Sequence, residues 1–350
     1  MTVVSKISFK ATLPSDVTTY DASSPFHQAA AAKIAKFLLV SRERTLEDPG
    51  LKEGLASMRG TWKTTQGARE LSLVTPDGDA VNGLHFPGTI PKAIIHLHGN
   101  GDFYELSVQK PLEWREALTS VVGERKDVPH LLVFNPRGTG ESEGVPHPAK
   151  VALDLFTAFE YLVHKHGIAP DDIIISGHSM GGYFGALGAA LVQETYPDHA
   201  IHFLSDRSFA SLTARACRRI EGSDYNRATR DLMGFATSCL MSASGWDADP
   251  IEALEKLKGR VCVLYNLKDA VIPYETSLHE ALTKSHRKRT YDCFALQEAS
   301  DSPFTARAHN RLFAADEQQK VLVEMKRMLR LPLTAEEDAL APLTSLEANV

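Results

Sequence analysis

The residue with the clearest chemical signature is Ser179, in the segment GHSMGG at 177–182. The apolar run at 173–175 precedes this segment and the helix-forming stretch YFGALGAALV follows, so the order predicts strand, sharp turn and helix. A serine on such a turn stands above the sheet edge, where its hydroxyl can act as a nucleophile. Neighbouring backbone then requires small residues at the positions of Gly177 and Gly181. A glycine-rich turn with an incidental serine is the simpler alternative, but the strand-turn-helix setting favours the nucleophile.

Acyl transfer to a serine needs two N–H donors that stabilise the negative oxygen of the tetrahedral intermediate. One is expected from Met180, directly after the serine, at the start of a helix whose positive dipole end favours the same charge. The second is expected from Asn100, in the loop His98-Gly99-Asn100-Gly101 that follows the apolar run at 93–97. The sequence therefore predicts an oxyanion hole formed by Asn100 and Met180.

The general base is predicted to be His309, within the polar stretch SDSPFTARAHNRLF. When a serine sits on a strand-to-helix turn of this kind, its partners follow in the chain order serine, acid, histidine. His309 is the only histidine after the last predicted strand, TYDCFAL. His98 and His178 are better explained by local hydrogen bonds or packing than by base catalysis.

The supporting acid is predicted to be Asp269, which follows the strand-like run VCVLYNLKD. Its function would be to fix the tautomer of the base and to stabilise the imidazolium. Asp206, at the end of the preceding predicted strand, is a competing candidate, and chain order alone does not separate the two. We favour Asp269.

The elements that carry these residues alternate between strands and helices. Two alternating segments, RELSLVT and AVNGLHF, flank the turn at 76–79 and predict a β-hairpin. Continuous apolar runs follow, as expected of strands buried on both faces: AIIHLHG, HLLVFNPRG, DIIISGHS, AIHFLSD, RVCVLYNLKD and TYDCFAL. Predicted helices lie between them near 105–122, 149–167, 180–194, 275–285 and 311–330. The pattern predicts an α/β fold with a mostly parallel, doubly wound sheet and helices on both faces.

Three further regions surround this sheet. Residues 1–60 are expected to form a helical extension, with an alanine-rich helix at 26–46, ahead of a catalytic domain at 61–330. The long connection at about 207–250 predicts a helical cap inserted in that domain. Residues 331–350 are expected to form a flexible tail, because they combine prolines and acids without an aromatic residue.

Composition restricts the class of function. The chain has 350 residues, 43% of them hydrophobic, and a net charge of -6, which disfavours a nucleic-acid surface. The beginning of the chain lacks the apolar run of a signal peptide, and no run is long enough to predict a transmembrane segment. The four cysteines lack the spacing of a metal site and are expected to be reduced thiols, so we predict no metal and a cytoplasmic location.

Together, HGNG, NPRGTGESEG, GHSMGG, LKDAVIP and AHN resemble the motifs of the α/β-hydrolase superfamily, from about Arg69 to Arg330. FNPRGTGESEG and GHSMGG are similar to monoglyceride-lipase-like serine hydrolases, and SDRSFASL to an uncharacterised hydrolase family first described in chlamydiae. The resemblance implies the α/β-hydrolase fold and an esterase, lipase or thioesterase without a cofactor. Asn266 and Ala308 stand where many relatives have glycine, close to the predicted acid and base.

The resemblance implies a small-molecule acyl ester as substrate, cleaved through an acyl-serine intermediate. A peptidase or amidase with the same serine is an alternative, and so is a non-catalytic scaffold that binds a ligand or a partner protein. Oligomeric state is not predicted. The chlamydial resemblance and acidic tail also raise export by a specialised bacterial secretion system.

Two groups of polar residues have a functional and a structural interpretation. Arginines of the predicted cap could attract an anionic substrate, although a solvated helical face explains them more simply: Arg207, Arg215, Arg218, Arg219, Arg227 and Arg230. Arg137 and Ser142 lie in a glycine-rich loop that could bind phosphate. The loop matches neither phosphate-binding glycine pattern, so a structural role is predicted for both.

Overall fold

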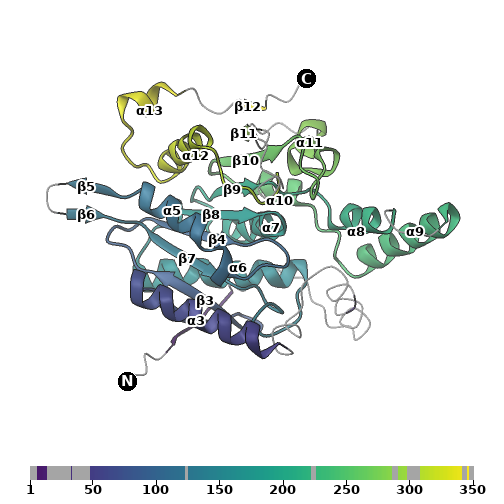
Figure 1. Ribbon diagram of the computed structural model, residues 1–350, viewed down its shortest axis with the longest axis horizontal. Coiled ribbons are helices and arrows are strands. Elements are labelled where there is room, and N and C mark those ends of the chain that lie inside the picture. Colours follow the sequence, from purple (N-terminus) through teal and green to yellow (C-terminus); the bar gives the residue numbers. More distant parts are fainter. Residues whose placement is uncertain are drawn as a thin grey trace.

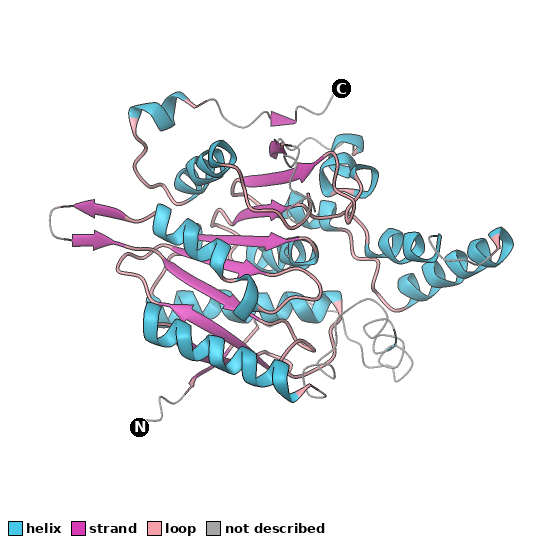
Figure 2. Ribbon diagram, in the orientation of Figure 1, coloured by secondary structure: helices cyan, strands magenta, loops and turns pink. Residues whose placement is uncertain are grey.

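The computed structural model describes residues 6–13, 33, 48–122, 125–221, 226–285, 291–297, 308–340 and 345–346. These residues form a central β-sheet with helices on both faces (Figures 1 and 2). Apart from residue 33, the predicted helix at 26–46 lies outside the described residues.

Within the described residues, the main sheet has ten strands in the order β1-β2-β3-β7-β4-β8-β9-β10-β11-β12. Their bounds are β1 Ile7–Lys10, β2 Arg69–Val74, β3 Ala80–Phe86, β4 Ala93–Leu97, β7 His130–Phe134, β8 Ile173–His178, β9 His202–Asp206, β10 Val261–Asn266, β11 Tyr291–Leu296 and β12 Ser345–Leu346. Strands β7, β4, β8, β9, β10 and β11 pair in parallel. Antiparallel pairing joins β3 to β2 and β7, so the predicted hairpin leads into a parallel sheet.

The two faces of the sheet have separate apolar cores, because side chains alternate along each strand. In β4, Ile95 contributes to the core beneath α6 Pro148–His166 and α7 Met180–Thr195. Ile94 points the other way, into the core beneath α5 Gln109–Ala117 and α12 Ala315–Met328. The other helices of the sheet layers are α3 Pro49–Gln66, α4 Tyr104–Ser107, α10 Pro250–Lys256 and α11 Leu278–Lys284.

The six predicted parallel strands and the hairpin are confirmed, because each buried apolar run forms a strand of the sheet. The helix predicted near 105–122 is shorter than expected. It is divided into α4 and α5, after which the chain forms a small hairpin of β5 Ser120–Val122 and β6 Arg125–Asp127. Valines after Ser120 favour a strand over a helix.

The long connection between β9 and β10 begins with α8 Leu212–Glu221 and α9 Arg227–Ala243, which precede α10. They project from the body beyond the carboxyl ends of the parallel strands (Figure 1).

In the region predicted as a tail, α13 Ala335–Ala339 precedes β12, which pairs with β11. None of the described helices combines the length and apolar character needed to span a bilayer.

Several buried histidines make stability sensitive to mild acid. Burial lowers the pKa of His96 to about 3 and that of His202 to about 4. Between these values and the ordinary pKa near 6.5, the unfolded chain binds protons that the folded chain does not, so stability falls as pH falls. We expect the free energy of unfolding in urea to decline from pH 6.5 to pH 4, by up to about 1.4 kcal/mol per pH unit for each such histidine.

His96→Gln tests the origin of this slope. A glutamine does not titrate, so the variant is expected to lose stability less steeply below pH 6.5 than the parent. His164→Gln, at an exposed position of α6, controls for the loss of a histidine as such. Equal slopes in the parent and His96→Gln would show that His96 does not contribute.

Candidate active site

Ser179 sits at the turn between β8 and α7, where it is the N-cap of the helix. Its backbone has φ 54° and ψ −118°, a region that residues with side chains rarely occupy. The strain persists because the turn is fixed on both sides: the Ser179 N–H donates to the Asp206 carbonyl at 2.8 Å, and the Ser179 carbonyl accepts from Gly182 at 3.0 Å. The serine is 7% exposed, at the floor of a pocket.

The flanking glycines are required by close backbone contacts. A Cβ on Gly177 would lie 2.2 Å from the Gly181 carbonyl oxygen, and a Cβ on Gly181 would lie 2.3 Å from that of Leu97. The loop after β4 also approaches the turn, because a Cβ on Gly99 would lie 3.4 Å from the Cβ of Ser179. The end of β4 therefore packs directly against the serine turn.

Gly181→Ala is expected to displace the serine turn, since the new methyl group meets backbone rather than a flexible side chain. We expect a lower melting temperature and markedly slower labelling of the serine by a fluorophosphonate. Gly60→Ala, in α3 where a Cβ meets nothing within 4 Å, is the matched control and is expected to gain up to about 1 kcal/mol of stability. Parent-like labelling and melting of Gly181→Ala would contradict the packing argument.

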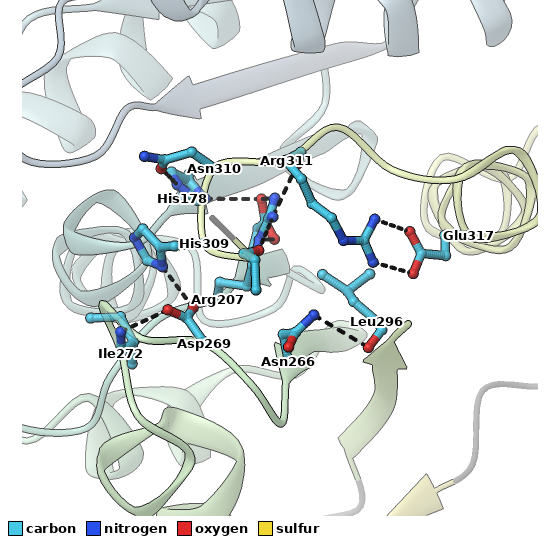
Figure 3. A network of polar contacts seen from close by, with 12 residues as sticks. His178, Arg207, Asn266, Asp269, Ile272, Leu296, His309, Asn310, Arg311 and Glu317 are labelled. Carbon is cyan, nitrogen blue, oxygen red and sulfur yellow. Dashed lines mark hydrogen bonds and ion pairs between the residues drawn. The ribbon is translucent and has the colours of Figure 1, made fainter. Parts of the chain in front are cut away.

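His309 and Asp269 meet although they are distant in sequence. Nδ1 of His309 lies 2.7 Å from Oδ2 of Asp269, and both side chains are buried (Figure 3). Oδ1 of Asp269 accepts from the backbone N–H groups of Val271 and Ile272, each at 2.8 Å. A carboxylate oxygen accepts, so Nδ1 of His309 is the donor in this contact. In a neutral imidazole with its proton on Nδ1, Nε2 carries the lone pair.

Asp206 is engaged elsewhere. Its carboxylate accepts from Lys110 at 2.6 Å, from Arg207 at 2.8 and 2.9 Å, and from Nδ1 of His178 at 3.0 Å. Burial favours the neutral acid, but the Arg207 and Lys110 charges outweigh it and hold the pKa of Asp206 well below its usual value. The same burial lowers the pKa of Lys110 to about 8 and that of His178 to about 4.

Arg207 connects Asp206 to the loop that carries His309. Its Nη1 donates to the carbonyls of Ala308, at 2.8 Å, and Arg311, at 3.0 Å, on either side of His309 (Figure 3). Arg311 in turn forms an ion pair with Glu317 in the first turn of α12. Arg207 itself has φ 48°, a conformation that its two sets of contacts maintain. Sequence reasoning missed this role, because it treated Arg207 as part of the cap.

The other polar residues singled out from the sequence have structural partners. His98 bonds the Gly99 carbonyl at 2.8 Å and the Asn135 side chain at 3.0 Å, as predicted for a structural histidine. Arg137 is fully buried among Asp154, Asp77 and Asp79, so its predicted structural role is confirmed. Asn266 also has partners, since its side chain donates to the Gln297 carbonyl at 3.0 Å and accepts from the Lys268 N–H at 2.8 Å.

Ser179, His309, Asn100 and Met180 all line one pocket of about 960 Å³. Apolar side chains contribute to its wall: Leu106, Phe209, Leu212, Ile272 and Leu312. Basic side chains also line it: Lys110, Arg207, Arg215, Arg218 and Arg311. In α9, Arg227 instead faces solvent and pairs with Asp231 at 3.8 Å, as expected of a solvated position.

The architecture is that of the α/β-hydrolases. The crystal structure of an α/β hydrolase from Vibrio vulnificus aligns with a TM-score of 0.56, covering 86% of this chain and 95% of that protein at 19% identity. The sheet order and this likeness confirm the predicted α/β-hydrolase fold. The monoglyceride-lipase-like and chlamydial branches stay predictions.

Comparison of sequences agrees with the fold. No family model matches the chain. The human phosphatidylserine lipase ABHD16A is 31% identical over 211 residues, which is 58% of this chain and 33% of that protein. An uncharacterised protein of Salmonella typhi, YfhR, is 28% identical over 170 residues, covering 45% of this chain and 55% of YfhR. The chain thus matches about half or less of the length of these relatives.

Proposed function

We propose that the protein is a serine hydrolase that cleaves a carboxylic ester or thioester through an acyl-serine intermediate. Ser179 is the nucleophile, His309 the general base and Asp269 the acid that orients the base. The observation that carries the proposal is the 2.7 Å contact between His309 and Asp269, because His309 lines the same pocket as Ser179, which sits on a strained strand-to-helix turn.

The proposed proton path is based on the contact between His309 and Asp269. Because Nδ1 of His309 donates to Asp269, Nε2 is the nitrogen that takes the Ser179 proton as the hydroxyl attacks the acyl carbon. The imidazolium then gives this proton to the leaving oxygen or sulfur, and the acyl group stays on Ser179. Water, activated by the same nitrogen, releases the acid and regenerates the enzyme.

Stabilisation of the oxyanion is assigned to the backbone N–H groups of Met180 and Asn100. Met180 begins α7, whose sixteen residues direct their positive dipole end at the nucleophile. The contact between Gly99 and the Ser179 turn supports the assignment of the neighbouring Asn100, since it brings that loop close to the reacting carbon.

The pocket fits an acyl ester with an apolar acyl chain. Leucine, isoleucine and phenylalanine side chains line part of it, and Leu106 and Leu312 are at least half exposed. The basic side chains toward α8 would favour an anionic group on the same substrate. Since the chain resembles part of a phosphatidylserine lipase, phosphatidylserine belongs among the candidate substrates.

Labelling with a fluorophosphonate probe tests the nucleophile. The expected result is a single covalent adduct, which peptide mass spectrometry assigns to Ser179. An unlabelled native protein, or an adduct on another serine, would contradict the proposal.

A substrate panel tests the type of bond. Short and long p-nitrophenyl esters, an acyl thioester, phosphatidylserine and aminoacyl anilides are compared at equal concentration. We expect esters or thioesters to be cleaved fastest, because the mechanism proposed for this pocket includes no specific contact to a peptide. Faster cleavage of the anilides would instead indicate a peptidase, and inertness toward all of them a binding scaffold.

A further inference from the structure

Three histidines from separate elements converge at a second place in the fold. His85 lies in β3, His130 begins β7, and His166 ends α6. Each presents one ring nitrogen such that the three nitrogen atoms lie within 4.8 Å of one another. His85 and His130 are buried and His166 is half-buried.

We propose that His85, His130 and His166 bind one divalent transition-metal ion, with zinc as the expected occupant. Imidazole nitrogens select zinc, copper, nickel and cobalt over magnesium or calcium, which prefer oxygen ligands. The site is independent of the proposed hydrolase activity.

Only small shifts are needed to hold such an ion: two of the histidines have to separate slightly, and the third has to approach. Nε2 of His85 and Nδ1 of His130 are already 2.9 Å apart. Zinc at its usual distance of about 2.1 Å from each nitrogen would hold the nitrogens roughly 3.4 Å apart. His166 is the ligand that has to approach, and its place at the end of α6, before Gly167 at φ 63°, allows this more readily than a place within a strand.

The protons and charges are compatible with coordination. A neutral imidazole offers the lone pair of one ring nitrogen to a metal ion and keeps its proton on the other nitrogen. The ion would replace the hydrogen bond between His85 and His130, after which His85 keeps its proton on Nδ1. That nitrogen lies 3.2 Å from the hydroxyl oxygen of Tyr161, which would accept from it.

The charges around the three histidines affect how tightly an ion would bind, and the position of the site in the fold determines the role of that ion. The site lies at the carboxyl end of α6, where the helix dipole favours a cation, but Arg69 and Arg115 oppose a positive charge there. Water or hydroxide would complete four coordination. His130 is at the amino end of β7, whereas Ser179 follows the carboxyl end of the parallel strand β8. The ion would therefore tie β3, β7 and α6 together without a part in hydrolysis.

The test uses the full chain without a histidine tag, after treatment with a chelator. Cobalt is titrated while the visible spectrum is recorded, zinc is added in competition, and melting temperature is measured with and without zinc. We expect one equivalent of cobalt to produce the strong visible bands of a tetrahedral site, zinc to abolish them, and zinc to raise the melting temperature.

His166→Ala is expected to remove the cobalt bands and to weaken zinc binding at least about tenfold. His164→Ala is the matched control, because His164 is on the same helix and its ring bonds Glu160 instead; it should bind as the parent does. Tyr161→Phe should retain the bands, since it keeps all three ligands. Circular dichroism of the metal-free variants monitors folding. Absence of tetrahedral bands in the parent, or equal binding by His166→Ala and the parent, would overturn the proposal.

Discussion

Replacing Ser179 by alanine is expected to lower kcat for a p-nitrophenyl ester at least about 10⁴-fold. The alanine variant has no hydroxyl to form the acyl intermediate, and only the oxyanion donors and substrate binding remain. Because substrate contacts are preserved, KM should change little. Initial rates over a range of ester concentrations measure both parameters.

Ser208→Ala is the matched control for this substitution. Ser208 is also a buried serine, and its Oγ would lie 2.9 Å from a Cβ on Gly182 in the first turn of α7. We expect this variant to keep the parent kcat. If Ser179→Ala retained most of the parent activity, another nucleophile would have to be sought.

Asp269→Asn and Asp206→Asn are expected to separate the two candidate acids. An amide at 269 cannot hold the proton on Nδ1 of His309 or stabilise the imidazolium, so kcat should fall about 10⁴-fold. An amide at 206 leaves the charges of Lys110 and Arg207 without their buried partner. Its main effect should be on stability, with a loss of about 3 kcal/mol.

Activity and unfolding are measured on both variants. Since Arg207 holds the carbonyls beside His309, Asp206→Asn should also lower kcat, but by less than about a hundredfold. The stability of Asp269→Asn should stay closer to that of the parent. If Asp206→Asn instead lowered kcat about 10⁴-fold and Asp269→Asn by less than about a hundredfold, the catalytic acid would be Asp206.

Much of the architecture follows from local patterns. Continuous apolar runs of strand length, such as Ile173-Ile174-Ile175, can be buried only in a sheet covered on both faces, and the helices between them impose parallel pairing. The segment after α5 was misassigned because a helical pattern continues into it, whereas β5 and β6 stabilise each other by pairing. Pairing partners are not visible in a local pattern.

The residues of the candidate site also fall into two groups, those that a local pattern identifies and those that it does not. The serine turn is local, so its glycines identify it from the sequence. Chain order points to His309 but leaves both Asp269 and Asp206 as candidate acids. The environment of Asp206 is not local: Lys110 is 96 residues away in sequence, and the carbonyl of Ala308 lies 101 residues from Arg207. The three histidines, of which His85 and His130 are 45 residues apart, likewise match no spacing motif. Only tertiary packing brings such groups together.

The place of Arg207 in the chain has an evolutionary consequence. Arg207 contacts the His309 loop from the beginning of the connection between β9 and β10, before α8 begins at Leu212. The helices α8 and α9, which follow this point, could be exchanged, lengthened or lost without removing the contact that positions His309. In the proposed hydrolase, selectivity for the acyl group and the chemistry of its transfer could therefore change separately, with Arg207 at the boundary between the two regions.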